Sequence, residues 1–164
     1  MLGLAAAVAC GTGVAVAHTL GVRATSATTR CEVRNLRLGN PQATGAAGTI
    51  RVRFVFRNVG SRTCSFFGYP GMRLLNTHHR QMPTTVTRAA ATPHSLLLAP
   101  GRKASFYAQY SDVPTGSEKC PAATYAAVWP PNDYRTITAA FPYPATACGG
   151  RISVWPVVLG VQPL

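Results

Sequence analysis

The chain has 164 residues, and 47% of them are hydrophobic. This apolar content excludes a disordered chain, whereas 15 glycines and 13 prolines are more than long helices tolerate. Sixteen lysines and arginines face only four acidic residues, and the resulting net charge of +12 would attract a polyanion.

The N-terminal segment is predicted to direct export. No charged residue precedes Arg23, and Ala15-Val16-Ala17 fits a small-x-small cleavage site, so residues 1–17 are interpreted as a signal peptide. The usual basic start is missing, which leaves an uncleaved anchor as the alternative. Residues 18–30 are mostly small and polar, as in a flexible stalk.

Cysteine usage supports the same location. Cys10 follows a poor version of the lipoprotein acylation sequence, so it is either a lipid attachment site or an ordinary apolar residue of the leader. Removal of the leader leaves four cysteines, an even number that predicts two disulfide bonds in an exported chain. They permit three pairings, and the residues alone do not choose among them. Zinc is the weaker interpretation because no Cys-x-x-Cys or Cys/His cluster is present. The four are Cys31, Cys64, Cys120 and Cys148.

Residues 31–164 are predicted to form one β-sandwich domain. The clearest alternation runs from Ile50 to Arg57, with apolar residues on one face and three arginines on the other. No helical stripe, repeat or second domain boundary follows the leader, so the predicted fold is all-β, an immunoglobulin-like two-sheet β-sandwich of seven to nine short strands. It differs from an antibody domain because no Trp lies between Cys64 and Cys120. The other predicted strands are 31–38, 72–76, 96–98, 104–110, 125–129, 136–141 and 152–158.

The inventory of catalytic side chains is thin. With four carboxylates and four histidines, an acid–base pair has little support, and no Gly-x-Ser-x-Gly elbow occurs. His78 and His79 are adjacent and are interpreted as part of a hairpin tip. Asp112 and Glu118 are weak evidence for calcium and fit a solvated loop better. The sequence therefore predicts no enzyme, cofactor or metal, and a hydrolase with an unrecognised site is the least favoured alternative.

Arginines provide the main candidate for a binding surface. They could line an outward face that binds phosphate or carboxylate groups, although outward strand positions are polar in any case and a solvated face is the favoured interpretation. Nucleic acid is not expected, since no stacked-aromatic or helix-turn-helix signature appears. Tyr69 and Trp129-Pro-Pro-Asn132 are interpreted as plugs of the core rather than as a ligand platform. The candidate anion-binding residues are Arg34, Arg37, Arg51, Arg53 and Arg57.

A set of turn and cysteine landmarks extends from Cys31 through Val154 and resembles an exported actinobacterial family known only as domain of unknown function 4232. The resemblance implies an exported or membrane-tethered protein without assigned activity. It also implies the disulfide pairs Cys31 with Cys64 and Cys120 with Cys148, each of which would close a local excursion. The landmarks, besides the four cysteines, are Gly45-Ala-Ala-Gly48, Asn58-Val-Gly60, Gly68-Tyr-Pro-Gly71, Leu98-Ala-Pro-Gly101 and Pro130-Pro-Asn132.

The functional expectation is a non-enzymatic domain outside the cytoplasm, either secreted or associated with the cell envelope. Its expected partners are anionic envelope polymers or lipid headgroups, attracted by the basic surface. The alternative is an interaction module that recognises one protein partner through sheet edges or corner loops. Membrane contact is expected only through the leader or through a lipid on Cys10.

Overall fold

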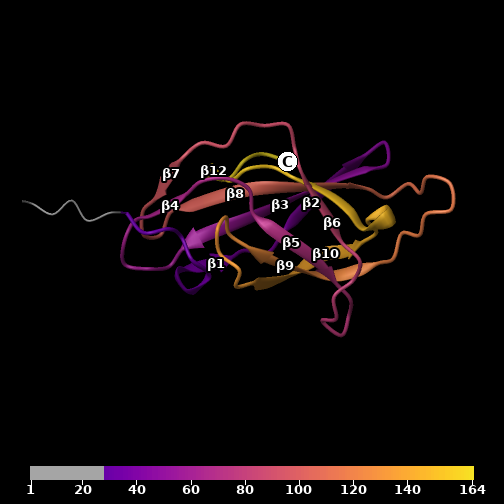
Figure 1. The fold of residues 1–164 in the computed structure, drawn as a ribbon, viewed down its shortest axis with the longest axis horizontal. Coiled ribbons are helices and arrows are strands. Elements are labelled where there is room, and N and C mark those ends of the chain that lie inside the picture. Colours follow the sequence, from indigo (N-terminus) through magenta and orange to yellow (C-terminus); the bar gives the residue numbers. More distant parts are fainter. Residues whose placement is uncertain (1–27) are drawn as a thin grey trace, which may run out of the picture.

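Two long strands form the centre of the largest sheet in the computed structural model, which describes residues 28–164 (Figure 1). They are β3 (Thr49–Asn58) and β8 (Lys103–Ser111), antiparallel from the Thr49–Ser111 pair to the Arg57–Lys103 pair. The predicted signal peptide, Cys10 and the first part of the predicted stalk lie outside the described residues.

Short strands line both sides of this central pair. On one side β1 (Leu36–Leu38) and β2 (Gln42–Ala46) pair one after the other with β3. On the other side β11 (Arg151–Val154) and β12 (Val158–Leu159) pair in the same manner with β8. A proline, which has no N–H to donate, lies in each interruption: Pro41 between β1 and β2, and Pro156 between β11 and β12. The parallel neighbour of β11, β6 (Thr85–Arg88), completes seven strands.

Two smaller sheets complete the fold. The three-stranded sheet has the order β10 (Ile137–Ala145), β9 (Ala123–Trp129), β5 (Gly71–Leu75), and it lies below the β3–β8 pair in Figure 1. β4 (Cys64–Phe66) and β7 (Leu96–Leu98) form a two-stranded sheet. The helical elements are two short 3₁₀ turns, η1 (Val33–Asn35) and η2 (Cys148–Gly150). Within residues 28–164, no helix has the length and apolarity needed to cross a membrane.

The predicted all-β sandwich is confirmed, with differences in detail. The described residues contain twelve strands in three sheets, rather than seven to nine strands in two sheets. The strand expected at 31–38 is reduced to β1 because η1 occupies its middle, and the strand expected at 152–158 is divided into β11 and β12. β2, β4 and β6 were not predicted, because they are short and carry no regular apolar alternation.

Aromatic side chains join the sheets in the core. Phe54 on β3 stacks on Phe106 on β8, with ring centroids 5.0 Å apart. Phe141 on β10 meets Phe54 edge-on at 6.2 Å and so connects the small sheet to the large one. These rings bring large apolar area out of water, which is the main driving force for closing the sandwich. The face of Ile50–Arg57 predicted to be apolar is therefore the buried face.

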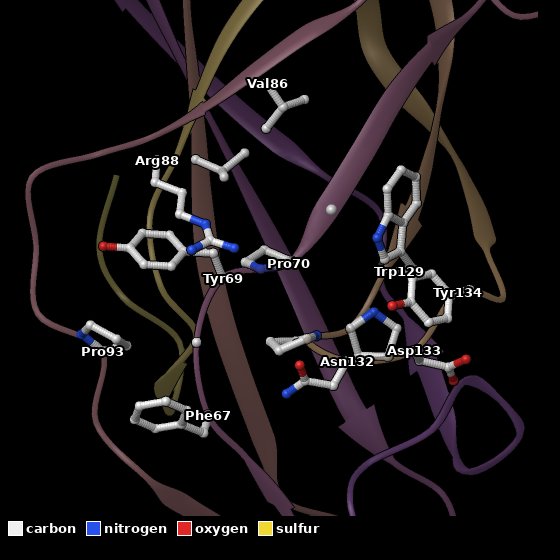
Figure 2. A pocket seen from close by; sticks show the side chains of 15 residues that line it. Phe67, Tyr69, Pro70, Val86, Arg88, Pro93, Trp129, Asn132, Asp133 and Tyr134 are labelled. Atoms are coloured by element: carbon white, nitrogen blue, oxygen red, sulfur yellow. The ribbon is translucent and has the colours of Figure 1, made fainter.

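The Gly68-Tyr-Pro-Gly71 corner carries the chain from β4 to β5, and the side chains around it appear in Figure 2. Gly68 has a φ of +109°, a conformation that residues with a side chain rarely adopt. Gly71 lies against the Trp129 ring, where a β-carbon would have no room. Steric constraints thus explain why both positions are glycine. The corner also brings Tyr69 and Trp129 to one surface.

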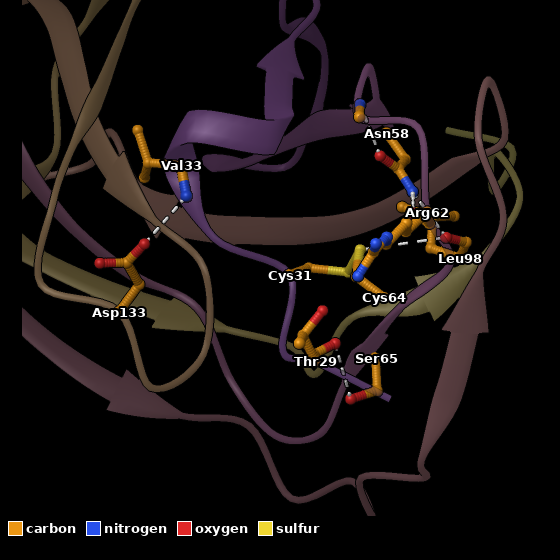
Figure 3. Close-up of a disulfide and its surroundings, with 10 residues drawn as sticks. Thr29, Cys31, Val33, Asn58, Arg62, Cys64, Ser65, Leu98 and Asp133 are labelled. Atoms are coloured by element: carbon orange, nitrogen blue, oxygen red, sulfur yellow. Dashed lines mark hydrogen bonds between the residues drawn. A yellow bond between two sulfur atoms is a disulfide. The ribbon is translucent and has the colours of Figure 1, made fainter. Parts of the chain in front are cut away.

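Two disulfide bonds cross-link the domain, and they join the pairs that the family resemblance implies. Cys31 is bonded to Cys64, as Figure 3 shows, and Cys120 is bonded to Cys148. The first bond attaches the N-terminal segment to β4, where the Thr29 carbonyl also accepts a hydrogen bond from the Ser65 amide at 2.9 Å. Thr29 and Arg30, which lie in the predicted stalk, thus contact Ser65 on β4. Two disulfides indicate folding in an oxidising compartment.

Asn58 ties the end of β3 to the chain around it. Its side chain is 1% exposed, and its amide donates to the carbonyls of Arg62 at 2.9 Å and Leu98 at 2.8 Å (Figure 3). Its Oδ1 accepts from the Gly60 amide at 2.9 Å. All three bonds satisfy groups in the turn between β3 and β4 or on β7, so this buried polar side chain holds two segments in place.

Candidate functional site

Three basic side chains lie in one row across three neighbouring strands of the large sheet. Arg37 on β1 is the register partner of Arg57 on β3, and Arg57 is the partner of Lys103 on β8. Neighbouring strands are about 4.8 Å apart, so side chains opposite one another project close together from the same face. All three are exposed. We call Arg37, Arg57 and Lys103 the basic row.

A hollow of about 340 Å³ opens beside the basic row. All three members of the row line it, together with the fourth cation Arg53. Gln42 on β2 and Val161 near the C-terminus contribute to its walls. The four cations around one cavity give it a strongly positive potential, which suits phosphate or carboxylate groups.

Within residues 28–164, no carboxylate forms an ion pair with the basic row. Glu32, Glu118 and Asp133 each pair with an arginine outside it. Asp112 follows the opposite end of β8, about 30 Å along the strand from Lys103. Like charges opposite one another on adjacent strands repel and lower stability. Repulsion within the basic row is therefore expected to lower the stability of the fold, and a bound anion would relieve this repulsion.

Arg51 and Arg53 project from the same face of β3 but already have partners. The Arg51 guanidinium lies 5.4 Å from the Tyr107 ring centre and 5.7 Å from that of Trp155, as in cation–π contacts. It also donates to Gln109 at 3.2 Å. Arg53 donates to the side chain of Gln42 and to the carbonyl of Gln162. Arg51 is thus held against aromatic rings, and Arg53 anchors the C-terminal segment over the sheet.

Arg34 lies apart from the other four candidate arginines. It belongs to η1, and its guanidinium forms an ion pair with Glu32 at 2.9 Å. Glu32 also accepts from Arg135 at 3.0 Å. Four of the five candidate arginines therefore share one face of the large sheet. Among these four, the side chains of Arg37 and Arg57 have no carboxylate or hydrogen-bonding partner in the part of the chain described. The fifth, Arg34, neutralises Glu32 away from this face.

Lys103 is the member of the row that sequence reasoning missed. The predicted strand began one residue later, at Ala104, so Lys103 was left in the turn. The alternation of β8 extends back to residue 103, but its position beside Arg57 depends on the long-range register of β3 with β8. No sequence pattern near Lys103 predicts the register of β3 with β8.

A larger hollow of about 510 Å³ lies at the Gly68–Gly71 corner (Figure 2). Arg88 and Tyr69 stand on one side of it, and Trp129 and Tyr134 stand on the other, with Pro70 between them. We call this cavity the aromatic hollow. Its lining also includes Phe67, Pro93, Pro130, Pro131 and Asn132.

The expectation that Tyr69 and Trp129 only plug the core describes part of their environment. The Tyr69 hydroxyl donates to the carbonyls of Ala89, at 3.0 Å, and Ala91. Its polar tip thus finds backbone partners, as expected for a plug. Both rings nevertheless line the hollow, and the Tyr134 side chain beside them is 93% exposed. Tyr134 was not a candidate, because a single tyrosine in a loop carries no sequence signal.

The carboxylate at the edge of the aromatic hollow is neutralised from within the protein. Asp133 accepts from the Val33 amide at 2.9 Å and from the amide of Arg135 at 3.0 Å, and its side chain is only 9% exposed. Burial opposes its ionisation, but these hydrogen bonds and the Arg135 guanidinium together hold its pKa below the usual value. Asp133 is therefore an ionised structural group that fastens the 130–135 loop to η1.

The remaining polar candidates do not converge. His78 and His79 belong to the turn after β5, where Asn76 accepts from the amides of His78 and Arg80, and the His79 ring stacks on Tyr125 with centroids 4.1 Å apart. Across residues 28–164, no group of three or more His, Cys, Asp or Glu side chains is placed to hold a metal ion.

The geometry defines a disulfide-bonded β-sandwich with a basic surface and a separate aromatic hollow. Residues 31–158 match the family model described as domain of unknown function DUF4232. The chain belongs to this family. No curated protein and no solved structure matches it.

Proposed function

We propose that this protein is a non-enzymatic binding domain outside the cytoplasm, which holds an anionic polymer of the cell envelope on its basic row. The observation that carries the proposal is the adjacency of Arg37, Arg57 and Lys103 on three strands, with no carboxylate partner among residues 28–164. Three basic side chains on neighbouring strands, which lie about 5 Å apart, suit the repeated phosphates or carboxylates of a polymer better than a single small anion.

The chemistry of the row supports binding rather than catalysis at this place. Arginine stays protonated at all accessible pH values, and lysine has an ordinary pKa far above neutrality. Such groups attract and orient anions, but they do not exchange protons near pH 7, as a general acid or base must. The two disulfides support a location outside the cytoplasm.

Co-sedimentation of the oxidised protein with cell-envelope fragments tests the proposal. We expect binding at low salt that decreases as salt is raised, because exposed charges are screened. The variant Arg37→Gln/Arg57→Gln/Lys103→Gln should bind about tenfold more weakly, since it loses several charge-assisted contacts. Arg30→Gln/Arg62→Gln/Arg80→Gln removes the same net charge from exposed positions outside the row and is the matched control.

Competitors identify the source of the anion. Acidic lipid vesicles that displace the fragments would point to headgroups, and competition by DNA would indicate attraction to any polyanion. Equal weakening in both triple variants would contradict a local site. Envelope binding that persists at high salt would instead support the protein-partner alternative, whose interface would depend on apolar contacts.

A further inference from the structure

We propose that the aromatic hollow is a second binding site, which takes a saccharide unit that carries a carboxylate. This inference goes beyond the proposed function, because the aromatic hollow and the cavity beside the basic row share no lining residue. It would hold even if the basic row bound nothing.

The size and walls of the hollow fit a small polar ring. Its volume of about 510 Å³ falls within the usual range of ligand sites, about 300–1,000 Å³. Phe67 is 56% exposed and Tyr134 is 93% exposed, so apolar ring surface faces water at its rim. The C–H face of a sugar ring can cover such surface while its hydroxyl groups stay at the edge, where the polar ends of Trp and Tyr lie.

The hydrogen-bonding groups of the hollow favour a sugar over an extended peptide. Four prolines line it and offer no N–H, so its backbone cannot form the ladder that a peptide strand needs. The available polar groups are side chains, chiefly Arg88, Asn132 and Tyr134. None of these three makes a side-chain hydrogen bond to another residue in the 28–164 range.

The charge of the hollow selects an acidic sugar. The Arg88 guanidinium is exposed, lies 5.3 Å from the Tyr69 ring centre, and forms no ion pair within the described part of the chain. Asp133 does not oppose Arg88, because Arg135 neutralises it. An arginine fixed over a ring can present two N–H groups to one carboxylate.

The two tryptophans provide a direct test. Trp129 lines the hollow, whereas Trp155 lies beside Arg51 on the outer face of the large sheet. The chain has no other tryptophan, so Trp155→Phe leaves Trp129 as the sole indole reporter. Titration with a disaccharide of glucuronic acid and N-acetylglucosamine should give a saturable change in its fluorescence. Neutral chitobiose should bind more weakly because it lacks the carboxylate.

Two substitutions separate the charge from the stacking surface. Arg88→Gln should weaken the acidic disaccharide about tenfold and leave chitobiose unchanged, because only the carboxylate uses the guanidinium. Tyr134→Ser should weaken both sugars. The matched controls are Arg80→Gln and Tyr143→Ser, which alter exposed residues outside the hollow and should change neither affinity.

Four results would overturn the inference. The first is the absence of a saturable response to either sugar, and the second is an equal effect of the control substitutions. The third is a response of the wild-type protein that disappears in Trp155→Phe, which would place the sugar beside Arg51 on the outer face of the large sheet instead of in the aromatic hollow. Binding of a proline-rich peptide but of no saccharide would also contradict it. Titration calorimetry of the wild-type protein and Arg88→Gln repeats the test without the Trp155 substitution.

Discussion

The indole ring of Trp129 occupies the space that a side chain at Gly71 would need. A β-carbon on residue 71 would lie 1.9 Å from the ring, far inside van der Waals contact. The two residues are register partners on β5 and β9, and the ring lies over residue 71 of the neighbouring strand. The absence of a side chain on Gly71 thus sets the position of one wall of the aromatic hollow.

Gly71→Ala should therefore move Trp129 and destabilise the fold. We expect a loss of about 1–3 kcal/mol in the free energy of unfolding, which is typical of overpacking, together with a changed tryptophan emission spectrum of the native state. Urea unfolding followed by fluorescence measures both. Gly39→Ala is the control, because its β-carbon would meet only the Val55 carbonyl, at 3.7 Å, and stability should change by less than about 0.5 kcal/mol. Equal losses of stability in Gly71→Ala and Gly39→Ala would show that the Trp129 ring can move aside without cost.

Asn58→Ala should cost about 3 kcal/mol. It removes the three hydrogen bonds of a buried side chain and leaves the carbonyls of Arg62 and Leu98 and the amide of Gly60 without their partner. Asn76→Ala removes two bonds at an exposed turn, where water replaces them, and should cost less than about 1 kcal/mol. Chemical unfolding of both variants checks this order, and a larger loss in Asn76→Ala would contradict it.

The two disulfides should differ in their contribution to stability. Their cysteines are 33 and 28 residues apart, so loop-closure entropy assigns each about 3–4 kcal/mol. Cys31 and Cys64 are only 1% and 3% exposed, so replacing both by alanine also leaves a cavity. We expect that double variant to be less stable than Cys120→Ala/Cys148→Ala in urea unfolding. Unfolding of the reduced wild-type protein provides the control, and the reverse order would show that the cavity closes without cost.

Acid should weaken the attachment of the 130–135 loop. Because the folded pKa of Asp133 lies below its usual value of 3.8, its stabilising contribution is complete above that value. The contribution is lost as the pH falls through the lower folded pKa. Asp133→Asn should be less stable than the wild-type protein at pH 7, and the difference should shrink in strong acid. Thermal unfolding across pH measures it, with Asp112→Asn as the control, and a difference independent of pH would contradict the assignment.

Local patterns predicted the long strands and the short strand β7, but they missed β2, β4 and β6. Alternating residues from Ile50 to Arg57 identify β3 and its buried face, because a strand of ten residues repeats the alternation several times. β6 has only four residues, Thr85 to Arg88, and its place is determined by parallel pairing with β11, which is 66 residues further along. Sequence-local reasoning has no access to such a contact.

The candidate site was likewise predictable only where it depends on local sequence patterns. Alternation placed Arg51, Arg53 and Arg57 on one face of β3 correctly, since the period of a strand is local. It did not reveal that the segment around Gln162 returns to accept from Arg53, or that Lys103 lies beside Arg57. The aromatic hollow is assembled from loops and strands distant in sequence, and only the folded chain brings them together.

The basic row contains no histidine. Two of its three members are arginines and the third is a lysine, and side chains of these two types keep their charge near neutral pH. An anion held there would not be released by mild acidification, as it would from a histidine-based site. Release would require ionic competition, through salt, multivalent anions or a divalent cation that binds the polymer. The row would therefore respond to the ionic composition of its surroundings rather than to their acidity.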